Sequence, residues 1–223
     1  MNRTPTKPRC AIVVCHPRAK SFVNSVAAHV EDAAQAAGYE TIVRELYAMA
    51  FDPVLHARDI ALHEGGGRPA PAVEQEIALL GRPTLIILIY PIWFGSAPGM
   101  LKGYVERVLG AGFAGPGTVP LAAGPRPELL LTIATSGATS AWIEKKGIAA
   151  SAGRTFGAYL AGALAIPTAE HIAVDNVIPT MSEARGKTAL ERVAKAVREI
   201  FSGRRPATPK IDARWDTLPH PAA

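Results

Sequence analysis

The chain has 223 residues and a formal net charge of +5 at pH 7. Its length is sufficient for one large domain with a full core, and its 48% hydrophobic content excludes a disordered chain. No apolar run approaches the roughly 20 residues of a membrane span, and the run from Cys10 to Cys15 is too short for a signal-peptide core. We therefore expect a cytoplasmic protein with one domain over residues 1–223 and irregular tails at 1–8 and 204–223.

The positive charge could indicate a nucleic-acid partner, but the basic residues are scattered apart from Arg204 and Arg205. No nucleic-acid-binding motif is present, so attraction of anionic ligands such as nucleotides explains the charge better. Cys10 and Cys15 lie in one predicted strand and point to opposite faces, which argues against a mutual disulfide or a shared metal. We expect neither nucleic acid nor metal as a partner.

The first predicted strand, Ala11 to Cys15, leads through the polar loop HPRAKS into a helix from Val23 to Ala37. Ser21 suits the N-cap of this helix, and Gly38 marks its end. Free backbone N–H groups and the positive end of the helix dipole favour an anion at such a loop. The Walker and dinucleotide-binding patterns are both absent. The loop is therefore either a phosphate site of another kind or an ordinary serine-capped helix start.

The central stretch runs from Leu85 to Gly112 and changes character twice. Leu85 to Tyr90 is an unbroken apolar run, typical of a strand buried on both faces of a parallel sheet. A helix follows from Ala97 or Pro98, with apolar residues at helical spacing. Two aromatic residues lie between them in a turn rich in Pro and Gly, where an open α/β sheet binds its ligands. The alternative is that the aromatics only fill the gap between strand and helix.

The rest of the chain continues the alternation of strands and helices. A flexible surface loop is expected over Glu64 to Pro71, and the segment from His56 to Ile60 is expected to continue an apolar connection. The polar loop from Thr135 to Ser140 offers hydroxyl and amide donors, with Gly137 allowing close backbone approach. The other expected elements are strands at Glu40–Leu46, Glu128–Ala134 and Glu170–Val174, helices at Ala72–Leu80, Ala150–Leu164 and Ser182–Phe201, and a loop at Gly110–Pro127.

This pattern predicts an α/β fold of the flavodoxin-like, doubly wound type, with a five-stranded parallel sheet in the order 2-1-3-4-5 and helices on both faces. The first, third and fourth strands are neighbours in that order, so their loops lie side by side. A phosphate loop, an aromatic turn and a donor-rich loop together suit a flavin nucleotide.

The chain resembles the flavodoxin-like NAD(P)H:quinone oxidoreductases, the DT-diaphorase group with its bacterial relatives. The resemblance extends to about Val174 and rests on HPRAKSF, ELYAMAFDPVLHARDI, the long stretch PAVEQEIALLGRPTLIILIYPIWFGSAPGMLKGYVERVLGAGFAG, and TSGA. The P-x-W and P-x-x-L-K-G-x-x-E-R-V portions are specific, whereas TSGA alone would be weak. The resemblance implies a homodimer with a flavin at each subunit interface, reduced by NAD(P)H and reoxidised by a quinone in a ping-pong reaction.

The resemblance also assigns site residues. Those that would hold the flavin phosphates are His16, Ser21, Phe22 and Val23, the last through its backbone. Those that would line the isoalloxazine edge near N5 are Pro91, Ile92, Trp93 and Phe94. Those that would address the N1 and O2 side are Thr135, Ser136, Gly137 and Ala138, where donors stabilise the negative charge of the reduced flavin.

Four positions depart from the family pattern. Gly95 and Gly115 replace larger residues, which predicts a wider or differently closed pocket. Ile143 and Ala149 fall where DT-diaphorase places a tyrosine and a histidine near the flavin, so no catalytic residue is assigned. Hydride transfer between stacked rings depends mainly on positioning. We therefore expect flavin reduction without a titration from an active-site histidine.

The resemblance favours FAD over FMN, because the S-F loop and the YAM segment look closer to the FAD-using members, but FMN remains open. The alternative function is a non-catalytic flavodoxin-like electron carrier or a regulatory subunit of a membrane transporter. The basic charge argues against a carrier, because flavodoxin-type carriers are typically acidic. The choice between NADH and NADPH and the physiological acceptor stay open.

Overall fold

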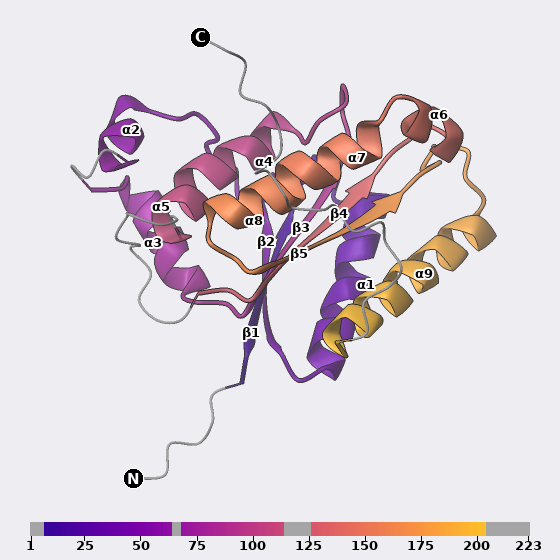
Figure 1. Cartoon of the computed structure of the whole chain (residues 1–223), viewed down its shortest axis with the longest axis horizontal. Coiled ribbons are helices and arrows are strands. Elements are labelled where there is room, and N and C mark those ends of the chain that lie inside the picture. Colours follow the sequence, from indigo (N-terminus) through magenta and orange to yellow (C-terminus); the bar gives the residue numbers. More distant parts are fainter. Residues whose placement is uncertain (1–6, 64–67, 114–125, 204–223) are drawn as a thin grey trace, which may run out of the picture.

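The structure, a computed structural model, describes residues 7–63, 68–113 and 126–203 (Figure 1). Its strands form one sheet in the order β2-β1-β3-β4-β5, and every neighbouring pair is parallel. The predicted fold class and strand order are therefore confirmed. The strands are β1 (Arg9–Val14), β2 (Glu40–Glu45), β3 (Leu85–Pro91), β4 (Leu129–Thr135) and β5 (Thr168–Val174).

The burial of each strand follows its place in the sheet. Every residue of the central strand β3 is buried, whereas the edge strands β2 and β5 are mostly half-buried. The register pairs Val14 with Ile89 and Pro91 with Thr135, so β1, β3 and β4 end at the same edge of the sheet. The loops predicted to bind a ligand all leave from this edge.

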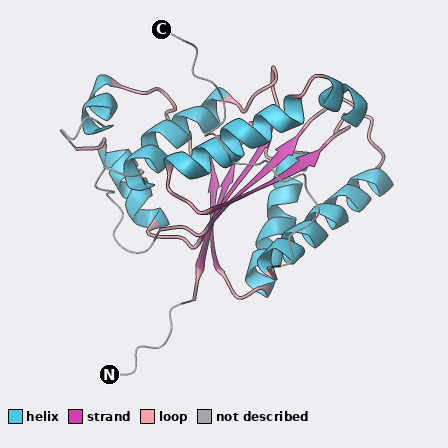
Figure 2. Ribbon diagram, viewed as in Figure 1, coloured by secondary structure: helices cyan, strands magenta, loops and turns pink. Residues whose placement is uncertain are grey.

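One face of the sheet is covered by α1 (Phe22–Ala36) and α9 (Glu183–Phe201), which lie side by side (Figures 1 and 2). Apolar side chains of α1, such as Val26 and Val30, pack with Val193 and Val197 of α9 against alternate residues of the strands. Cys10 belongs to this cluster and Cys15 to the opposite one, so the expected divergence of the two thiols is confirmed.

The other face carries two helical runs that each contain a π-helical segment (Figure 1). The first run consists of α4 (Gly99–Tyr104), η1 (Val105–Leu109) and α5 (Gly110–Phe113), with α3 (Pro71–Leu80) packed against η1. The second run consists of α7 (Ile148–Ala152), η2 (Gly153–Tyr159) and α8 (Leu160–Ala163). Two shorter helices are α2 (Ala57–His63) and α6 (Ser140–Lys145). No helix within the described ranges combines the length and the apolar character that a membrane crossing needs.

Three secondary-structure predictions were wrong in part. The predicted loop at Gly110–Pro127 begins as helix, because Leu109, Ala111 and Phe113 are buried and Gly112 packs closely on Ile77, where a Cβ atom would come within 3.3 Å. This glycine permits close packing and does not mark a turn.

Ala57–His63, expected to continue a connection, forms α2, whose start is capped by the Asp59 carboxylate accepting the His56 N–H at 2.9 Å. The helix expected from Ala150 is preceded by the separate helix α6 and begins earlier. The loop expected at Glu64–Pro71 lies partly outside the described residues, at 64–67, and its last residue, Pro71, already belongs to α3. Gly115 also lies outside the described residues.

Candidate functional site

The loops after β1, β3 and β4 are joined to one another by direct contacts. The Cys15 N–H donates to the Ile89 carbonyl at 2.9 Å, and the Ile92 N–H donates to the Thr135 carbonyl at 2.7 Å. The rings of His16 and Trp93 lie 5.9 Å apart between centroids. The structure therefore brings the three predicted ligand loops together at one edge of the sheet.

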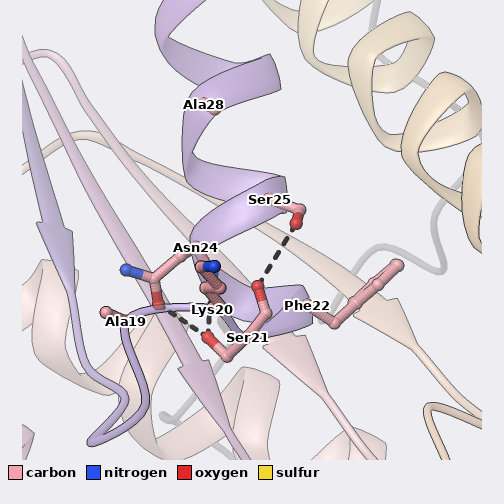
Figure 3. A pocket seen from close by; sticks show the side chains of 7 residues that line it. All are labelled: Ala19, Lys20, Ser21, Phe22, Asn24, Ser25 and Ala28. Atoms are coloured by element: carbon pink, nitrogen blue, oxygen red, sulfur yellow. Dashed lines mark hydrogen bonds between the residues drawn. The ribbon is translucent and has the colours of Figure 1, made fainter.

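Ser21 begins α1 as its N-cap, and its hydroxyl oxygen accepts the Asn24 N–H at 3.2 Å. The backbone N–H groups of Lys20, Ser21 and Phe22 donate to no described residue. An open pocket of about 580 Å³ lies against this helix start and is lined by Ala19, Lys20, Ser21, Phe22, Asn24, Ser25 and Ala28 (Figure 3). Unpaired amide donors at the positive end of a 15-residue helix make an electrostatically favourable place for an anion.

His16 follows β1 and is half-buried beside the helix start. Its Nδ1 accepts the Arg18 N–H at 3.1 Å, so in the neutral ring the proton is on Nε2, which is left as a donor. Burial lowers the pKa of His16 below its usual value and the Arg18 charge adds to this shift, whereas the Arg18 carbonyl, 3.4 Å from Nδ1, opposes it. The neutral form of His16 therefore predominates at pH 7. The side chain of Val23, by contrast, is buried in the core and offers only its backbone to this loop.

The turn after β3 is a tight hairpin. Trp93 and Ser96 pair in an antiparallel bridge, with N–H to carbonyl distances of 2.9 and 3.1 Å in the two directions. The two residues between them, Phe94 and Gly95, both have positive φ angles, of 51° and 82°. Positive φ at both central positions is typical of a type I′ turn, which suits Gly but strains Phe.

The same hairpin exposes its aromatic residues. Phe94 is fully exposed at the tip, and Trp93 is 38% exposed. The alternative that both rings only fill the gap between strand and helix is therefore wrong. The two residues before them are less accessible: Pro91 is buried and Ile92 is half-buried. An exposed aromatic ring held on strained backbone is a feature that occurs at binding sites.

The loop after β4 is ordered by its own hydrogen bonds. Thr135 is the last residue of β4, and both Thr135 and Ser136 are buried. The Ser136 hydroxyl accepts the Ala138 N–H at 3.1 Å, and the Val177 N–H donates to the Ser136 carbonyl at 2.9 Å. The Ala138 amide is thus satisfied internally, while the amide of the exposed Gly137 donates to no described residue. The amides of Thr139 and Ser140 likewise donate to no described residue, so this loop offers several unpaired backbone donors.

The positions that depart from the family pattern lie just beyond this loop. Ile143 is buried in α6 and contributes to the core, and Ala149 lies in α7. Trp142 is exposed on α6, which Thr139 caps by accepting the Trp142 N–H at 3.3 Å.

Sequence reasoning missed Asn24. It lines the pocket, and its amide oxygen accepts a hydrogen bond from the Ser21 hydroxyl, with 2.6 Å between the two oxygens. The signal was present, because Asn24 lies three residues after the N-cap serine, the spacing at which a polar side chain returns to the cap.

A doubly wound parallel sheet with joined loops at the carboxyl ends of β1, β3 and β4 defines a flavodoxin-like protein. The model of a family described as having the flavodoxin-like fold matches residues 8–200 of the chain. The protein belongs to this family.

The curated relatives that match part of the chain carry oxidoreductase names. An uncharacterized NAD(P)H oxidoreductase of Haemophilus influenzae is 36% identical over 104 residues, which are 46% of this chain and 51% of the relative. NAD(P)H dehydrogenase (quinone) 1 of Rattus norvegicus is 31% identical over 150 residues, 59% of this chain and 55% of the relative. The chain spans about half the length of the curated relatives that it matches.

Solved structures share the fold. The NAD(P)H:quinone oxidoreductase from Methanothermobacter marburgensis superposes with a TM-score of 0.74 at 24% identity, covering 87% of this chain and 96% of that chain. The general stress protein 14 from Treponema denticola, solved in complex with FMN, gives a TM-score of 0.57 at 20% identity, with coverage of 89% and 100%.

Proposed function

We propose that the protein is a flavin-dependent oxidoreductase that takes a hydride from NAD(P)H and passes two electrons to a quinone-type acceptor in a ping-pong reaction. The observation that carries the proposal is the junction of three loops at one sheet edge, one rich in unpaired amides, one aromatic and one rich in hydroxyls. The names of the curated relatives, NAD(P)H oxidoreductase and NAD(P)H dehydrogenase (quinone), support the same reaction class.

The loop after β1 fits the phosphate end of a flavin. Its unpaired amides, from Lys20 to Phe22, lie at the start of a 15-residue helix whose dipole favours negative charge. The neutral His16 ring contributes its Nε2–H as a hydrogen-bond donor. In this proposal the phosphate is held by the His16 ring, by the backbone amides of Ser21 and Phe22, and by the backbone of Val23.

The hairpin after β3 fits a flat aromatic ring system. Phe94 and Trp93 offer exposed ring surface, and the bridge between Trp93 and Ser96 fixes the position of the tip. Burial of aromatic surface against a ligand ring contributes favourably beyond the area removed from water. In this proposal the isoalloxazine wall consists of Pro91, Ile92, Trp93 and Phe94.

The loop after β4 would supply hydrogen-bond donors to the N1 and O2 side of the ring, and the residues proposed there are Thr135, Ser136, Gly137 and Ala138. Of the four proposed residues, Gly137 offers a free backbone amide, whereas the Ala138 amide already donates to the Ser136 hydroxyl. A fixed donor aimed at developing negative charge stabilises the reduced state. Ser136 thus acts mainly by holding the turn that presents Gly137.

The bound flavin would supply the hydride-accepting ring, and the protein would supply position. Ile143 is buried and apolar and Ala149 has no ionisable group, so neither residue can transfer a proton. Positioning of two stacked rings can by itself lower a barrier by about 7–11 kcal/mol. Reduction by NAD(P)H should therefore show no titration from a histidine at these positions.

The proposal includes FAD as the preferred flavin, with FMN as the alternative, and a cytoplasmic homodimer as the working form. Purified protein should be yellow, and chromatography of the flavin released by denaturation should identify it. A colourless protein that takes up neither FAD nor FMN when they are offered would contradict the proposal.

A further inference from the structure

A chain of hydrogen bonds connects the pocket at the start of α1 with the end of the edge strand β2. The Ser21 hydroxyl donates to the Asn24 amide oxygen at 2.6 Å, and the Asn24 amide nitrogen donates to the Glu45 carboxylate at 2.8 Å. Figure 3 shows the Asn24 side chain with its oxygen towards Ser21 and its nitrogen directed away. Glu45 is exposed and is the last residue of β2.

The carboxylate fixes the direction of this chain. An ionised carboxylate can only accept hydrogen bonds, so the Asn24 NH₂ group must face Glu45. The Asn24 oxygen must then face Ser21, and it takes the single proton of the Ser21 hydroxyl. While Glu45 is present, the Ser21 hydroxyl is held as an internal donor and is not available to a ligand.

The same carboxylate is close enough to act by its charge. Two short hydrogen bonds and one planar amide separate it from Ser21, a span comparable with the Debye length of about 8 Å at physiological ionic strength. Lys20 and Arg18 are exposed and form no ion pair with a described residue. Their charges attract both the terminal phosphate of FMN and the diphosphate of FAD. Glu45 opposes them on one side of the pocket.

The two flavin nucleotides differ in the charge that they would bring here. FMN ends in a phosphate monoester with a charge of about −1.5 to −2 at pH 7, which needs many donors. FAD carries the charge on two linked phosphates, each near −1. The Glu45 carboxylate and the unavailable Ser21 hydroxyl therefore weaken binding of the FMN monoester more than binding of the FAD diphosphate.

We infer that Glu45, acting through Asn24, is a specificity-determining pair that disfavours flavins with a terminal phosphate and thereby selects the dinucleotide FAD. This inference rests on the proposed flavin site and adds to it a residue outside the three loops. Asn24 is a positioning residue, because it transmits the direction of the hydrogen bonds to Ser21. Replacing Glu45 by Gln allows the Asn24 amide to turn, which releases the Ser21 proton to a ligand.

Equilibrium dialysis of the apoprotein against FAD, FMN and riboflavin tests the inference. Glu45→Gln should tighten FMN binding about fivefold, FAD binding by less than about twofold, and riboflavin, which has no phosphate, not at all. The matched control is Glu40→Gln, which removes the same charge from the other end of β2, where Glu40 pairs with Arg9 at 3.3 Å. An unchanged FMN-to-FAD affinity ratio in Glu45→Gln would overturn the inference.

A double-mutant comparison separates the hydrogen-bond chain from simple charge. With Asn24→Ala as the background, Glu45→Gln should change the FMN-to-FAD ratio by less than half as much as in the native chain. An equal change in both backgrounds would show that Asn24 does not transmit the effect and would refute its positioning role.

A flavin-free measurement distinguishes failure of this inference from failure of the proposed function. Inorganic phosphate is titrated into the native protein and Glu45→Gln while the backbone amide signals of Ser21, Phe22 and Asn24 are followed by NMR. Tighter phosphate binding in Glu45→Gln would uphold the effect of Glu45 even if no variant bound a flavin. Equal phosphate affinity in the two proteins would refute it.

Discussion

Two regions of the molecule differ in whether their polar groups have partners. On the face covered by α3 and η1, buried charges are fully matched: Arg107 pairs with Asp59 at 3.0 Å, and Glu76 accepts from Arg44 and from the Tyr104 hydroxyl. At the carboxyl edge of the sheet, amides at the start of α1 have no described partner and Phe94 is fully exposed.

The difference indicates two roles. The region with the paired buried charges, the anchoring region, holds segments of the fold together, and the carboxyl edge of the sheet, the binding region, is suited to a ligand. Buried charges are tolerated only when paired. Arg107 fastens the segment around Asp52 and Asp59 to η1, and Glu76 joins α3 to β2 through Arg44. Unpaired donors and exposed rings at the other edge gain most when a ligand arrives. The account therefore predicts that the first region controls stability and the second controls flavin binding.

The largest expected effect is on the anchoring region. Arg107→Leu leaves the buried Asp59 carboxylate without its charged partner, so the free energy of unfolding should fall by about 3–5 kcal/mol. Chemical denaturation measures this loss. The control is Lys102→Leu, which removes the pair between the exposed Lys102 and the half-buried Glu106 on the same helical run and should change stability by less than about 1 kcal/mol. A similar loss in both variants would show that the buried pair is worth no more than the surface pair.

An intermediate effect is expected from pH. Burial lowers the pKa of His171 to about 4, opposed by Asp175, and its Nδ1 lies 2.8 Å from the Thr132 hydroxyl while Nε2 has no described partner. The unfolded chain, with a pKa of about 6.5, binds this proton more readily. His171 therefore lowers stability as pH falls from 6.5 towards 4, by at most about 3 kcal/mol.

Denaturation at several pH values measures this slope. His171→Gln should be less sensitive to pH in that window, because the titrating group is gone. An identical pH dependence of unfolding in His171→Gln and the native protein would show that His171 is protonated equally in both states.

The smallest effect concerns the strained hairpin of the binding region. Phe94→Asn places a residue that tolerates positive φ before Gly95, so it should stabilise the fold by about 1 kcal/mol. Phe94→Ala removes the ring but keeps the strained backbone. Both variants should slow flavin reduction by NAD(P)H, and only Phe94→Asn should gain thermal stability. Native reduction rates in both variants would show that the exposed ring does not serve the site.

The sheet and the loops of the candidate site could be located from the sequence because their signals are local. The unbroken apolar run at Leu85–Tyr90 identified the central strand, and polar or aromatic residues directly after three strands identified the loops. The positive φ at Phe94 could not be predicted, because it depends on the bridge between Trp93 and Ser96.

Long-range pairing explains the rest of what was missed. Asn24 and Glu45 are 21 residues apart and meet only because β2 pairs beside β1. Helix α5 was not predicted, because its two glycines suggested a loop. The packing of Gly112 against Ile77 is visible only when the helices are assembled.

The most direct test of the account is stopped-flow mixing of the flavin-loaded protein with NADH or NADPH, followed by a benzoquinone. The account predicts that one of the nucleotides bleaches the flavin absorption and that the quinone restores it, with no titration near pH 6.5 in the reductive step. A flavin that neither nucleotide bleaches would contradict the proposed enzyme and favour a carrier or regulator.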